Sequence, residues 1–412
     1  MITVKPFSAL RPREEYVKEC AALPYDVMSS DEARKEVKGK PYSFLHIDKA
    51  EIDLDPSVDL YDDAVYAKAA ENLKKFETDG VYVQDEKKSF YFYRQIMDGR
   101  AQTGIVGCPS IDDYLENRIK KHELTRADKE LDRIRHVDTC SAQTGPIFLA
   151  YKESETLDQV IERETENVPL YDFVADDGIR HTVWKSSSLE TDQAIENAFS
   201  KLDSLYIADG HHRAASAVKA GLKRREQGYD GNEEFNYFLS VIFPAKSLKI
   251  FDYNRLLKDL GGKTEEEFLQ AVAENLGEVK EETENIPYRP SETHTIGLFV
   301  GGKWYSVRFH EKICQAKEPS KRLDCDILQK AFLSPVLGIQ DPRTDKRIDF
   351  VGGIRGLKYL EDRCKTDMAA AISMHPVTME ELISVADAGE IMPPKSTWFE
   401  PKLRSGILIH KI

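Results

Sequence analysis

The sequence lacks the patterns that mark several common classes of protein. No run approaches the roughly 18 apolar residues of a membrane span, and the stretch MITVKPFSALRPREE has no apolar core of a signal peptide. None of the six cysteines forms a C-x-x-C pair, so we expect reduced thiols rather than a disulfide framework or a zinc site. These absences predict a cytoplasmic protein with no membrane partner.

The sequence also lacks an excess of positive charge. Its 58 Lys and Arg residues are outnumbered by 72 Asp and Glu residues, which gives a formal net charge of −14. Broad binding to nucleic acid or anionic membranes calls for a basic surface, so we do not expect nucleic acid as a partner. The acidity is compatible with a local basic pocket for phosphate, and solubility alone also explains it.

Two familiar phosphate-binding motifs are missing as well. No G-x-x-x-x-G-K-[ST] occurs anywhere in the chain. The segment FVGGIRGLKYL at 350–360 has the strand–glycine–helix form of a phosphate loop, but it lacks the G-x-G-x-x-G spacing of a dinucleotide site. Tight packing therefore explains its glycines better than a ligand does.

The elements that are present indicate a mixed architecture. The 412 residues are enough for two or three domains. In the middle of the chain, helical spacing over 189–203 and 211–228 alternates with apolar strand patterns over 204–208 and 236–245, and residues 61–79 have helical spacing as well. This alternation predicts an α+β, that is mixed α/β, fold.

Local patterns give further elements. Alternating aromatics over 81–97 predict a hairpin, and Gly301-Gly302 predicts another. Residues 111–123 are expected to form a helix. Residues 280–295 are polar with two prolines, and are a candidate linker or long loop.

One short stretch asks for a functional explanation. Residues 206–221 read YIADGHHRAASAVKAG, an apolar strand followed by an acid, a glycine, two histidines, an arginine and an alanine-rich helix. The first turn of a helix exposes unpaired N–H groups and a partial positive charge, which suits an anion. Gly210 permits a sharp turn and a close approach of a ligand, and Arg213 can hold a phosphate or carboxylate by two hydrogen bonds.

The other three residues of this stretch supply proton and metal chemistry. His211 and His212 can donate or accept protons or bind metal. Asp209 could orient a histidine, take a proton or hold Mg²⁺. The plain alternative is that Asp209 caps the helix, but this leaves the histidines and Arg213 without a role.

Two other segments have phosphate-like chemistry. In KKHELTR at 120–126, Lys121 and Arg126 could neutralise phosphate and Glu123 could act as a general base or metal ligand. The alternative is a charged helix end facing solvent. In PPKSTWFEPK at 393–402, two prolines precede a group that could present N–H, O–H and ammonium donors to phosphate, namely Lys395, Ser396, Thr397 and Lys402. The alternative there is a rigid surface loop.

Two shorter segments carry weaker signals. Asp26 in PYDV could reach a shared site, although an ordinary turn explains it equally. Arg180 and His181 are adjacent on an expected strand, so alternation sends them to opposite faces and at most one would face a ligand.

These segments resemble known families. ADGHHRAASA at 208–217 is similar to the D-G-H-H-R or D-G-H-R-R element of the ParB and sulfiredoxin superfamily, which includes the free serine kinases that phosphorylate L-serine at the expense of a nucleotide. The whole chain resembles a widespread prokaryotic family of unknown function that is ParB-like or serine-kinase-like. That resemblance rests on PYDVMS at 24–29, KKHELTR, DGIRHTVW at 177–184, ADGHHRAASA and MPPKSTWFEPKLRSG at 392–406. It implies phosphate chemistry near Asp209, but the catalytic glutamate of the serine kinases does not carry over.

The combined prediction is a ParB/sulfiredoxin-like domain over 1–245 and a second α/β domain over 246–412, whose tail returns to the site. The leading hypothesis is a small-molecule phosphotransferase with Mg²⁺, with ATP or ADP, and with free serine as the favoured acceptor. The catalytic candidates are Asp209, His211, His212 and Glu123. The phosphate or nucleotide-binding candidates are Gly210, Arg213, Lys121, Arg126, Lys395, Ser396, Thr397 and Lys402.

Two alternatives stay open at this point. The same site could remove phosphate from phosphoserine or a similar ester, with a histidine protonating the leaving group. It could also belong to a nucleotide-binding ParB-like regulator without catalysis. The sequence leaves the nucleotide and the oligomeric state open.

Overall fold

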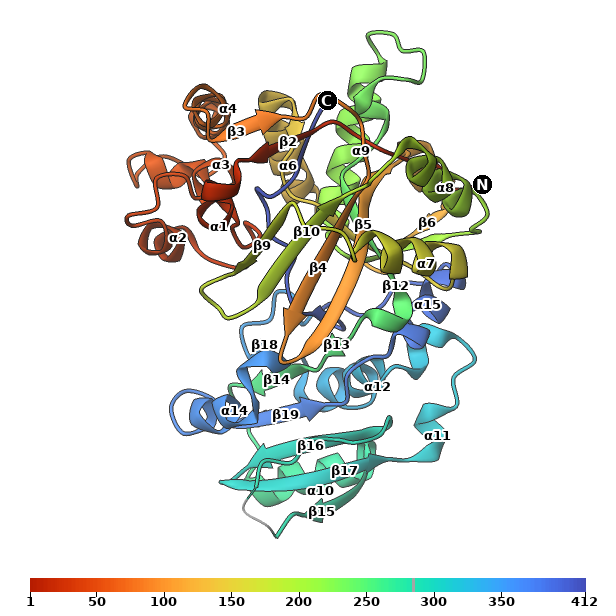
Figure 1. Ribbon diagram of the computed structural model, residues 1–412. Helices are drawn as coiled ribbons and strands as arrows, with labels where there is room; N and C mark the ends of the chain where they lie inside the picture. Colours follow the sequence, from red (N-terminus) through yellow and green to blue (C-terminus); the bar gives the residue numbers. More distant parts are fainter. Residues whose placement is uncertain (284–285) are drawn as a thin grey trace. The chain divides into compact units, whose positions relative to one another are not determined.

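The computed structural model describes residues 1–283 and 286–412 (Figure 1). Within these residues the chain forms two compact units, one of Met1–Leu248 with Pro401–Ile412 and one of Lys249–Glu400. We call them the first and the second unit. Each combines helices with β-sheet, which confirms the predicted α+β class. In the same described residues, no helix is both long and apolar enough to cross a bilayer.

The main sheet of the first unit has the strand order β6-β11-β8-β12-β5-β4-β10-β9, with β1 beside β5. Its strands are β1 Val4–Lys5, β4 Tyr91–Met97, β5 Arg100–Pro109, β6 Ile119–Lys120, β8 Ile147–Tyr151, β9 Tyr171–Val174, β10 Arg180–Lys185, β11 Leu205–Asp209 and β12 Ser240–Pro244. Because β6 and β11 are parallel, the segments that follow them leave from the same edge of the sheet.

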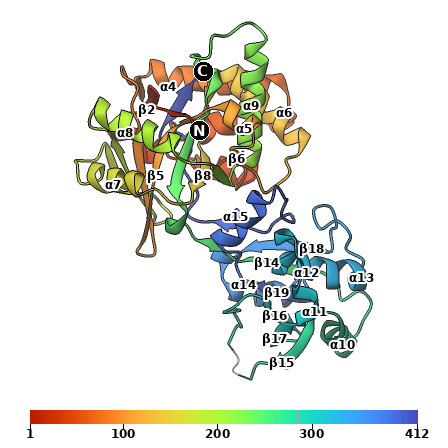
Figure 2. The same ribbon diagram turned by 90° about the vertical axis from the view of Figure 1, so that its right-hand side faces the viewer.

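Helices flank this sheet, and Figure 2 shows α7 and α8 on one side of it and α6 and α9 on the other. The helices of the first unit are α1 Val17–Cys20, α2 Ser30–Glu36, α3 Leu45–Asp48, α4 Asp63–Thr78, α5 Ile111–Leu115, α6 Ala127–Cys140, α7 Glu155–Glu164, α8 Leu189–Ser200 and α9 His211–Arg225. The alanines of α9 favour a helix, and Ala214, Ala217 and Val218 bury its apolar face in the core that includes Leu149 and Ile207. This packing fixes the junction between β11 and α9.

A smaller sheet of the first unit has the order β3-β2-β21-β7, with bounds β2 Ala9–Pro12, β3 Tyr82–Gln84, β7 Ala142–Gln143 and β21 Ile409–Lys411. Its apolar residues, such as Leu10 and Ile409, pack with α3 and α4 in a second core. Strand β21 lies between β2 and β7. The segment from Pro401 onward is therefore part of the first unit.

The second unit has a sheet of order β15-β17-β16-β19-β14-β18 and a two-stranded ribbon of β13 and β20. The strands are β13 Ile250–Phe251, β14 Tyr253–Leu257, β15 Gly277–Glu281, β16 Thr295–Val300, β17 Lys303–Phe309, β18 Ile348–Gly352, β19 Ala370–Met374 and β20 Trp398–Phe399. Its helices are α10 Glu265–Asn275, α11 Glu311–Cys314, α12 Asp324–Leu328, α13 Ser334–Leu337, α14 Leu357–Cys364 and α15 Met379–Asp387, with a π-helical turn over Gln329–Leu333.

Two predictions for the second unit can be checked against these strands. The hairpin through Gly301-Gly302 is confirmed, since β16 pairs with β17 around two glycines of positive φ. The segment 280–295 joins β15 to β16, which both pair with β17 in one sheet. It is thus a loop within that sheet, and its residues 284 and 285 lie outside the described part of the chain.

Two local predictions for the first unit are wrong. The helix expected over 111–123 ends at Leu115, because Asn117 adopts a φ of 57° that no right-handed helix accommodates. The chain then forms β6. The hairpin expected over 81–97 does not form either, since β3 pairs with β2 while β4 pairs with β5 and β10. The alternating aromatic residues predicted the strands β3 and β4 correctly, but not the strands with which they pair.

Candidate phosphate site at the junction of β11 and α9

The chain turns sharply between β11 and α9. The ladder between β11 and β8 shifts register between Ile207 and Asp209, and Gly210 has a φ of 90°, a left-handed conformation that favours glycine. Asp209 Oδ1 accepts a hydrogen bond of 2.7 Å from the N–H of Gly210. Among the residues that the structure describes, no side chain caps α9. Asp209 is therefore not the helix cap of the plain alternative, and the N–H groups of the first turn keep their capacity to bind an anion.

Asp209 forms an ion pair with Lys402, which lies near the C-terminal end of the chain. Lys402 Nζ donates to Asp209 Oδ2 at 2.9 Å, and the carbonyl of Lys402 accepts from Gln95 Nε2. The side chain of Asp209 remains 32% exposed. Burial alone would raise its pKa, but the charges of Lys402 and Arg213 outweigh burial and hold this pKa well below its ordinary value. Asp209 is thus a carboxylate at neutral pH and reachable by a ligand.

The two histidines bind the loop that follows β6. His211 Nε2 accepts from the N–H of His122 at 3.4 Å, and His212 Nε2 accepts from the N–H of Arg126 at 3.0 Å. Burial lowers the pKa of both imidazoles, that of His211 strongly. Both rings are therefore neutral at physiological pH and carry their proton on Nδ1. On His211, this Nδ1 lies 3.8 Å from Glu123 Oε2, which is beyond hydrogen-bond distance, so Glu123 lies beside the start of α9.

His122 is buried against His211. The two rings meet edge to face with centroids 4.4 Å apart, and His122 is 2% exposed. Neither of its ring nitrogens makes a hydrogen bond of good geometry to the residues that the structure describes. Burial lowers its pKa to about 4, although Asp209 acts in the opposite direction. The neutral imidazole of His122 thus packs against His211, the first residue of α9.

The guanidinium of Arg213 lies against Gly210 at the start of the helix, where a Cβ on Gly210 would be 3.1 Å from Arg213 Nε. Its Nη1 donates to the carbonyl of Pro146, and its Nε is buried without a partner among the described residues. The guanidinium lines a narrow cavity of about 30 Å³ together with Tyr25 and Asp48. This cavity has room for a water-sized group.

The remaining predicted residues have varied surroundings. Lys121 Nζ lies 4.4 Å from the centre of the Tyr114 ring. The guanidinium of Arg126 is exposed and pairs with Asp128 at 2.7 Å. The first unit thus brings together one group of predicted residues around the start of α9, namely Glu123, Asp209, Gly210, His211, His212, Arg213 and Lys402.

Lys395, Ser396 and Thr397 belong to the second unit. Ser396 Oγ donates to the carbonyl of Pro393 at 2.6 Å and lies 3.1 Å from Cys325 Sγ. Lys395 has a φ of 59°, and its Nζ lies 5.7 Å from the centre of the Tyr253 ring. Local packing accounts for these two residues.

Sequence reasoning missed two arginines that organise the first unit. Arg404, 5% exposed, pairs with Asp177 and donates to His181 Nε2 at 3.4 Å. His181 is buried and Arg180 exposed, as strand alternation predicts. Arg133 is partly buried, and its guanidinium lies 4.1 Å from the centre of the Tyr25 ring. The sequence did contain a signal for both arginines. Arg404 lies in MPPKSTWFEPKLRSG, and Tyr25, which contacts Arg133, lies in PYDVMS.

Metal-binding capacity at the junction is limited. In residues 1–283 and 286–412, no group of three or more His, Cys, Asp or Glu side chains could hold a metal. Mg²⁺ can bind through one or two carboxylates when phosphate oxygens and water complete its octahedron. Asp209 fits Mg²⁺ on those terms, as an ion that is bound together with a phosphate.

Comparison with known proteins places the chain in a family. The family described as protein of unknown function (DUF1015) matches residues 4–326, so the chain belongs to it. This confirms the family expected from the sequence motifs. No curated protein matches the chain.

Several solved structures are similar over much of the chain. A free serine kinase in complex with AMP is 18% identical, with a TM-score of 0.36, and the match covers 73% of this chain and 90% of that one. A conserved hypothetical protein from Pyrococcus furiosus is 17% identical, with a TM-score of 0.35 and coverage of 73% and 92%. SbnI with a C-terminal truncation, from Staphylococcus aureus, is 10% identical, with a TM-score of 0.38 and coverage of 73% and 85%.

Proposed function

We propose that the protein is a small-molecule phosphotransferase that acts at the junction of β11 and α9. The observation that carries the proposal is the uncapped start of α9 at Gly210, flanked by the partly exposed carboxylate of Asp209 and the ammonium of Lys402. Phosphoryl transfer depends mainly on positioning and on neutralising charge. The similarity of the D-G-H-H-R element to that of the free serine kinases supports free serine as the acceptor and ATP or ADP as the phosphate donor.

Each group at the junction has a distinct role in this proposal. The N–H groups at the start of α9 bind phosphate oxygens, and the missing side chain of Gly210 lets the Arg213 guanidinium lie close to them. Lys402 neutralises part of the phosphate charge. Glu123, which is half-exposed and held near His211, accepts the proton of the acceptor hydroxyl.

Asp209 has a different role from Glu123. Because its pKa lies well below the ordinary value, its carboxylate is a weak base at neutral pH. It is better suited to hold Mg²⁺ with the phosphate, or to orient the acceptor hydroxyl, than to take a proton. Mg²⁺ would supply further neutralisation of phosphate charge when bound.

The protonation state of the histidines favours transfer over hydrolysis of a phosphate ester. A histidine that protonates the leaving group of phosphoserine must be an imidazolium before the reaction. The pKa values of His211 and His212 are both lowered by burial, and both Nε2 atoms accept backbone hydrogen bonds. We therefore assign the two histidines to positioning of the loop 121–126.

Phosphorus NMR tests the proposal directly. One sample contains the protein, Mg²⁺ and L-serine with ATP or ADP, and a second contains the protein, Mg²⁺ and phosphoserine alone. A phosphoserine signal in the first sample supports the proposal. Its absence with both nucleotides overturns serine as the acceptor, and free phosphate in the second sample replaces the proposal with a phosphatase that transfers the phosphoryl group to water.

A matched pair of variants ties the activity to the site. Asp209→Asn removes the carboxylate at the junction. Asp172→Asn removes a carboxylate of the same unit that pairs with Arg180 on the neighbouring strand, at 2.6 Å. The proposal requires loss of activity in the first variant and full activity in the second.

A further inference from the structure

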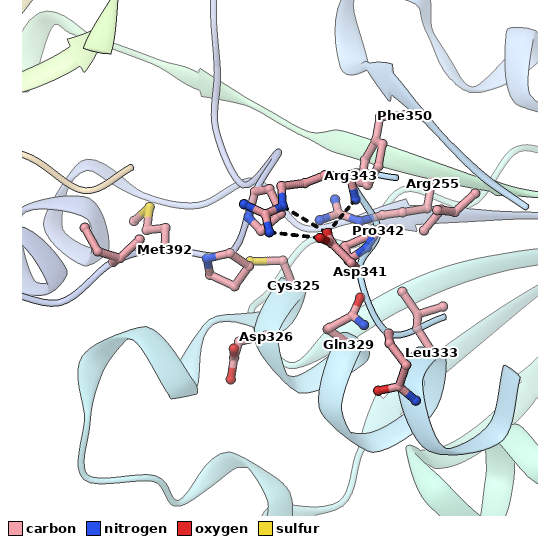
Figure 3. A pocket seen from close by; sticks show the side chains of 15 residues that line it. Arg255, Cys325, Asp326, Gln329, Leu333, Asp341, Pro342, Arg343, Phe350 and Met392 are labelled. Carbon is pink, nitrogen blue, oxygen red and sulfur yellow. Dashed lines mark hydrogen bonds and ion pairs between the residues drawn. The ribbon is translucent and has the colours of Figure 1, made fainter. Parts of the chain in front are cut away.

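The second unit contains a cavity that the phosphotransferase proposal does not use. Its volume is about 420 Å³, and it lies between strands β14 and β18, the π-helical turn and the segments 340–343 and 391–394 (Figure 3). Cavities of several hundred Å³ that combine apolar walls with a few polar groups are typical of small-molecule sites. The cavity belongs to this unit alone.

Arg255 is the unusual residue of this cavity. It comes from the middle of β14 and is 4% exposed, yet it lines the cavity wall. Its Nη1 donates to the carbonyl of Tyr253 and its Nη2 to that of Lys395, and its guanidinium lies 5.4 Å from the centre of the Phe350 ring. A guanidinium stays charged in proteins, so a full positive charge is buried at this wall.

No acidic side chain among the described residues neutralises Arg255 by an ion pair. Two acids line the same cavity, but each has a cation of its own. Asp341 pairs with Arg343 at 2.9 Å, and Asp326 pairs with Lys330 at 2.7 Å. Figure 3 shows the Asp341–Arg343 pair within the cavity. A buried charge without a counter-ion is costly, and an anion in the cavity would lower that cost.

The rest of the cavity suits an apolar body. Leu333, Phe350 and Met392 contribute apolar surface. The π-helical turn Gln329–Leu333 interrupts the passage from α12 to α13, and such turns occur frequently at functional sites. Here the turn places Leu333 and the amide of Gln329 on the cavity wall. A turn of this kind and a buried charge without an acid are independent observations, and both lie at the same cavity.

We propose that this cavity binds a small organic carboxylate, with its charged group at Arg255 and its apolar body against Leu333, Phe350 and Met392. A carboxylate fits better than a phosphate, because one guanidinium that already donates to two carbonyls offers a single positive charge. The site is separate in its residues from the junction of β11 and α9, and the inference does not depend on the proposed function.

A panel of four probes tests the site with the full chain. The probes are benzoate, 2-naphthoate, octanoate and phenyl phosphate, and binding is measured by saturation-transfer NMR and calorimetry. We expect at least one carboxylate to bind with a Kd below about 1 mM, and its neutral amide to bind at least about tenfold more weakly. Absence of binding for all three carboxylates, or tighter binding of phenyl phosphate, overturns the proposal.

Variants locate the binding. Arg255→Met removes the charge at similar volume and should weaken binding by about tenfold or more, whereas Arg308→Met, at an exposed strand position of the same unit, should leave binding unchanged. Ile391→Trp narrows the cavity from an exposed position, and it serves if Arg255→Met fails to fold. Binding that survives both Arg255→Met and Ile391→Trp overturns the proposal.

Discussion

The junction of β11 and α9 and the cavity at Arg255 differ in how their charges are paired. At the junction, Asp209 has Lys402, and both histidines already accept hydrogen bonds from the backbone. In the cavity, Arg255 has two carbonyls and no acid among the described residues. A ligand at the junction can bind the uncapped start of α9 but must exchange partners with the side chain of Asp209, whereas a ligand in the cavity supplies the charge that is missing.

This difference bears on the kind of function each site suits. Pre-paired, partly exposed groups cost little to maintain and can be rearranged during a reaction. A buried charge without a counter-ion favours a resident or tightly held ligand. The junction of β11 and α9 is thus better suited to a reaction, and the cavity at Arg255 is better suited to a bound ligand.

Asp209→Asn should have the largest effect. It removes the negative charge that the junction presents while keeping the shape of the side chain, and we expect turnover to fall by about a hundredfold or more. The melting temperature should fall by only about a few degrees, because the variant loses the ion pair with Lys402 but the side chain is partly exposed. Initial rates and thermal unfolding of the same preparation check this. A large drop in melting temperature with unchanged turnover would return Asp209 to a structural role.

Gly210→Ala should be the most destabilising of the conservative changes. At a φ of 90°, a Cβ is strained, and it would lie 3.1 Å from Arg213 Nε. Gly228→Ala is the matched control, since its φ is 98° but no atom lies within 4 Å of the added Cβ. We expect a loss of about 2 kcal/mol at Gly210 and about 1 kcal/mol at Gly228 in urea unfolding. Equal losses would show that the contact with Arg213 contributes nothing.

His212→Ala should release the loop 121–126 without removing a group that reacts. The N–H of Arg126 loses its acceptor, so its amide hydrogen exchange should become faster. Turnover should fall by roughly tenfold, through the position of Glu123. His212→Asn, which restores an acceptor, should recover part of both effects. Faster exchange without any change in turnover would separate the loop from the reaction.

Removing one cation from each site compares how much each cation contributes to the stability of the fold. Lys402→Met leaves Asp209 without its ion pair and should cost about 1 kcal/mol of stability. Arg255→Met leaves no acid of the described residues unpaired, so its cost should be smaller despite deeper burial. Denaturant unfolding of the two variants decides this. A greater loss for Arg255→Met would mean that its hydrogen bonds to the two carbonyls outweigh the burial of its charge.

His122→Phe should have the smallest effect at neutral pH and a visible one in acid. The folded imidazole has a pKa of about 4 against an ordinary value of 6.5. Below pH 6.5 the unfolded chain binds a proton that the folded chain does not, so stability falls toward pH 4 by at most about 1.4 kcal/mol per pH unit. Phenylalanine cannot titrate, and the variant should lose less stability than the native chain between about pH 7 and pH 5. Identical pH profiles would contradict this.

The sequence predicted those parts of the junction that depend on local pattern. Strand β11, the turn at Gly210 and helix α9 follow from an apolar run, a glycine and alanine-rich helical spacing, and all three are present. The helix expected over 111–123 failed at Asn117, whose left-handed conformation depends on its surroundings and not on its type alone.

Long-range features were harder to predict. The alternating pattern identified β3 and β4 as strands. It did not show that β3 pairs with β2 or that β4 pairs with β10, because these partners are distant in sequence and a local pattern carries no information about them. The role of the histidines as acceptors for the loop 121–126 required the parallel pairing of β6 and β11. Arg255 gave no signal, because nothing in a strand pattern shows which charged residue will be buried without a counter-ion.

The pairing of Asp209 with Lys402 has a consequence for the order in which the protein is made. The two residues are separated by 193 positions, and the whole of Lys249–Glu400 is synthesised between them. That stretch begins and ends with β13 and β20, which pair with one another. The β13–β20 pair can therefore form only after Trp398 and Phe399 have been made. The candidate phosphate site acquires its lysine only afterwards, so a nascent chain that stalls before Pro401 would present Asp209 without its cation.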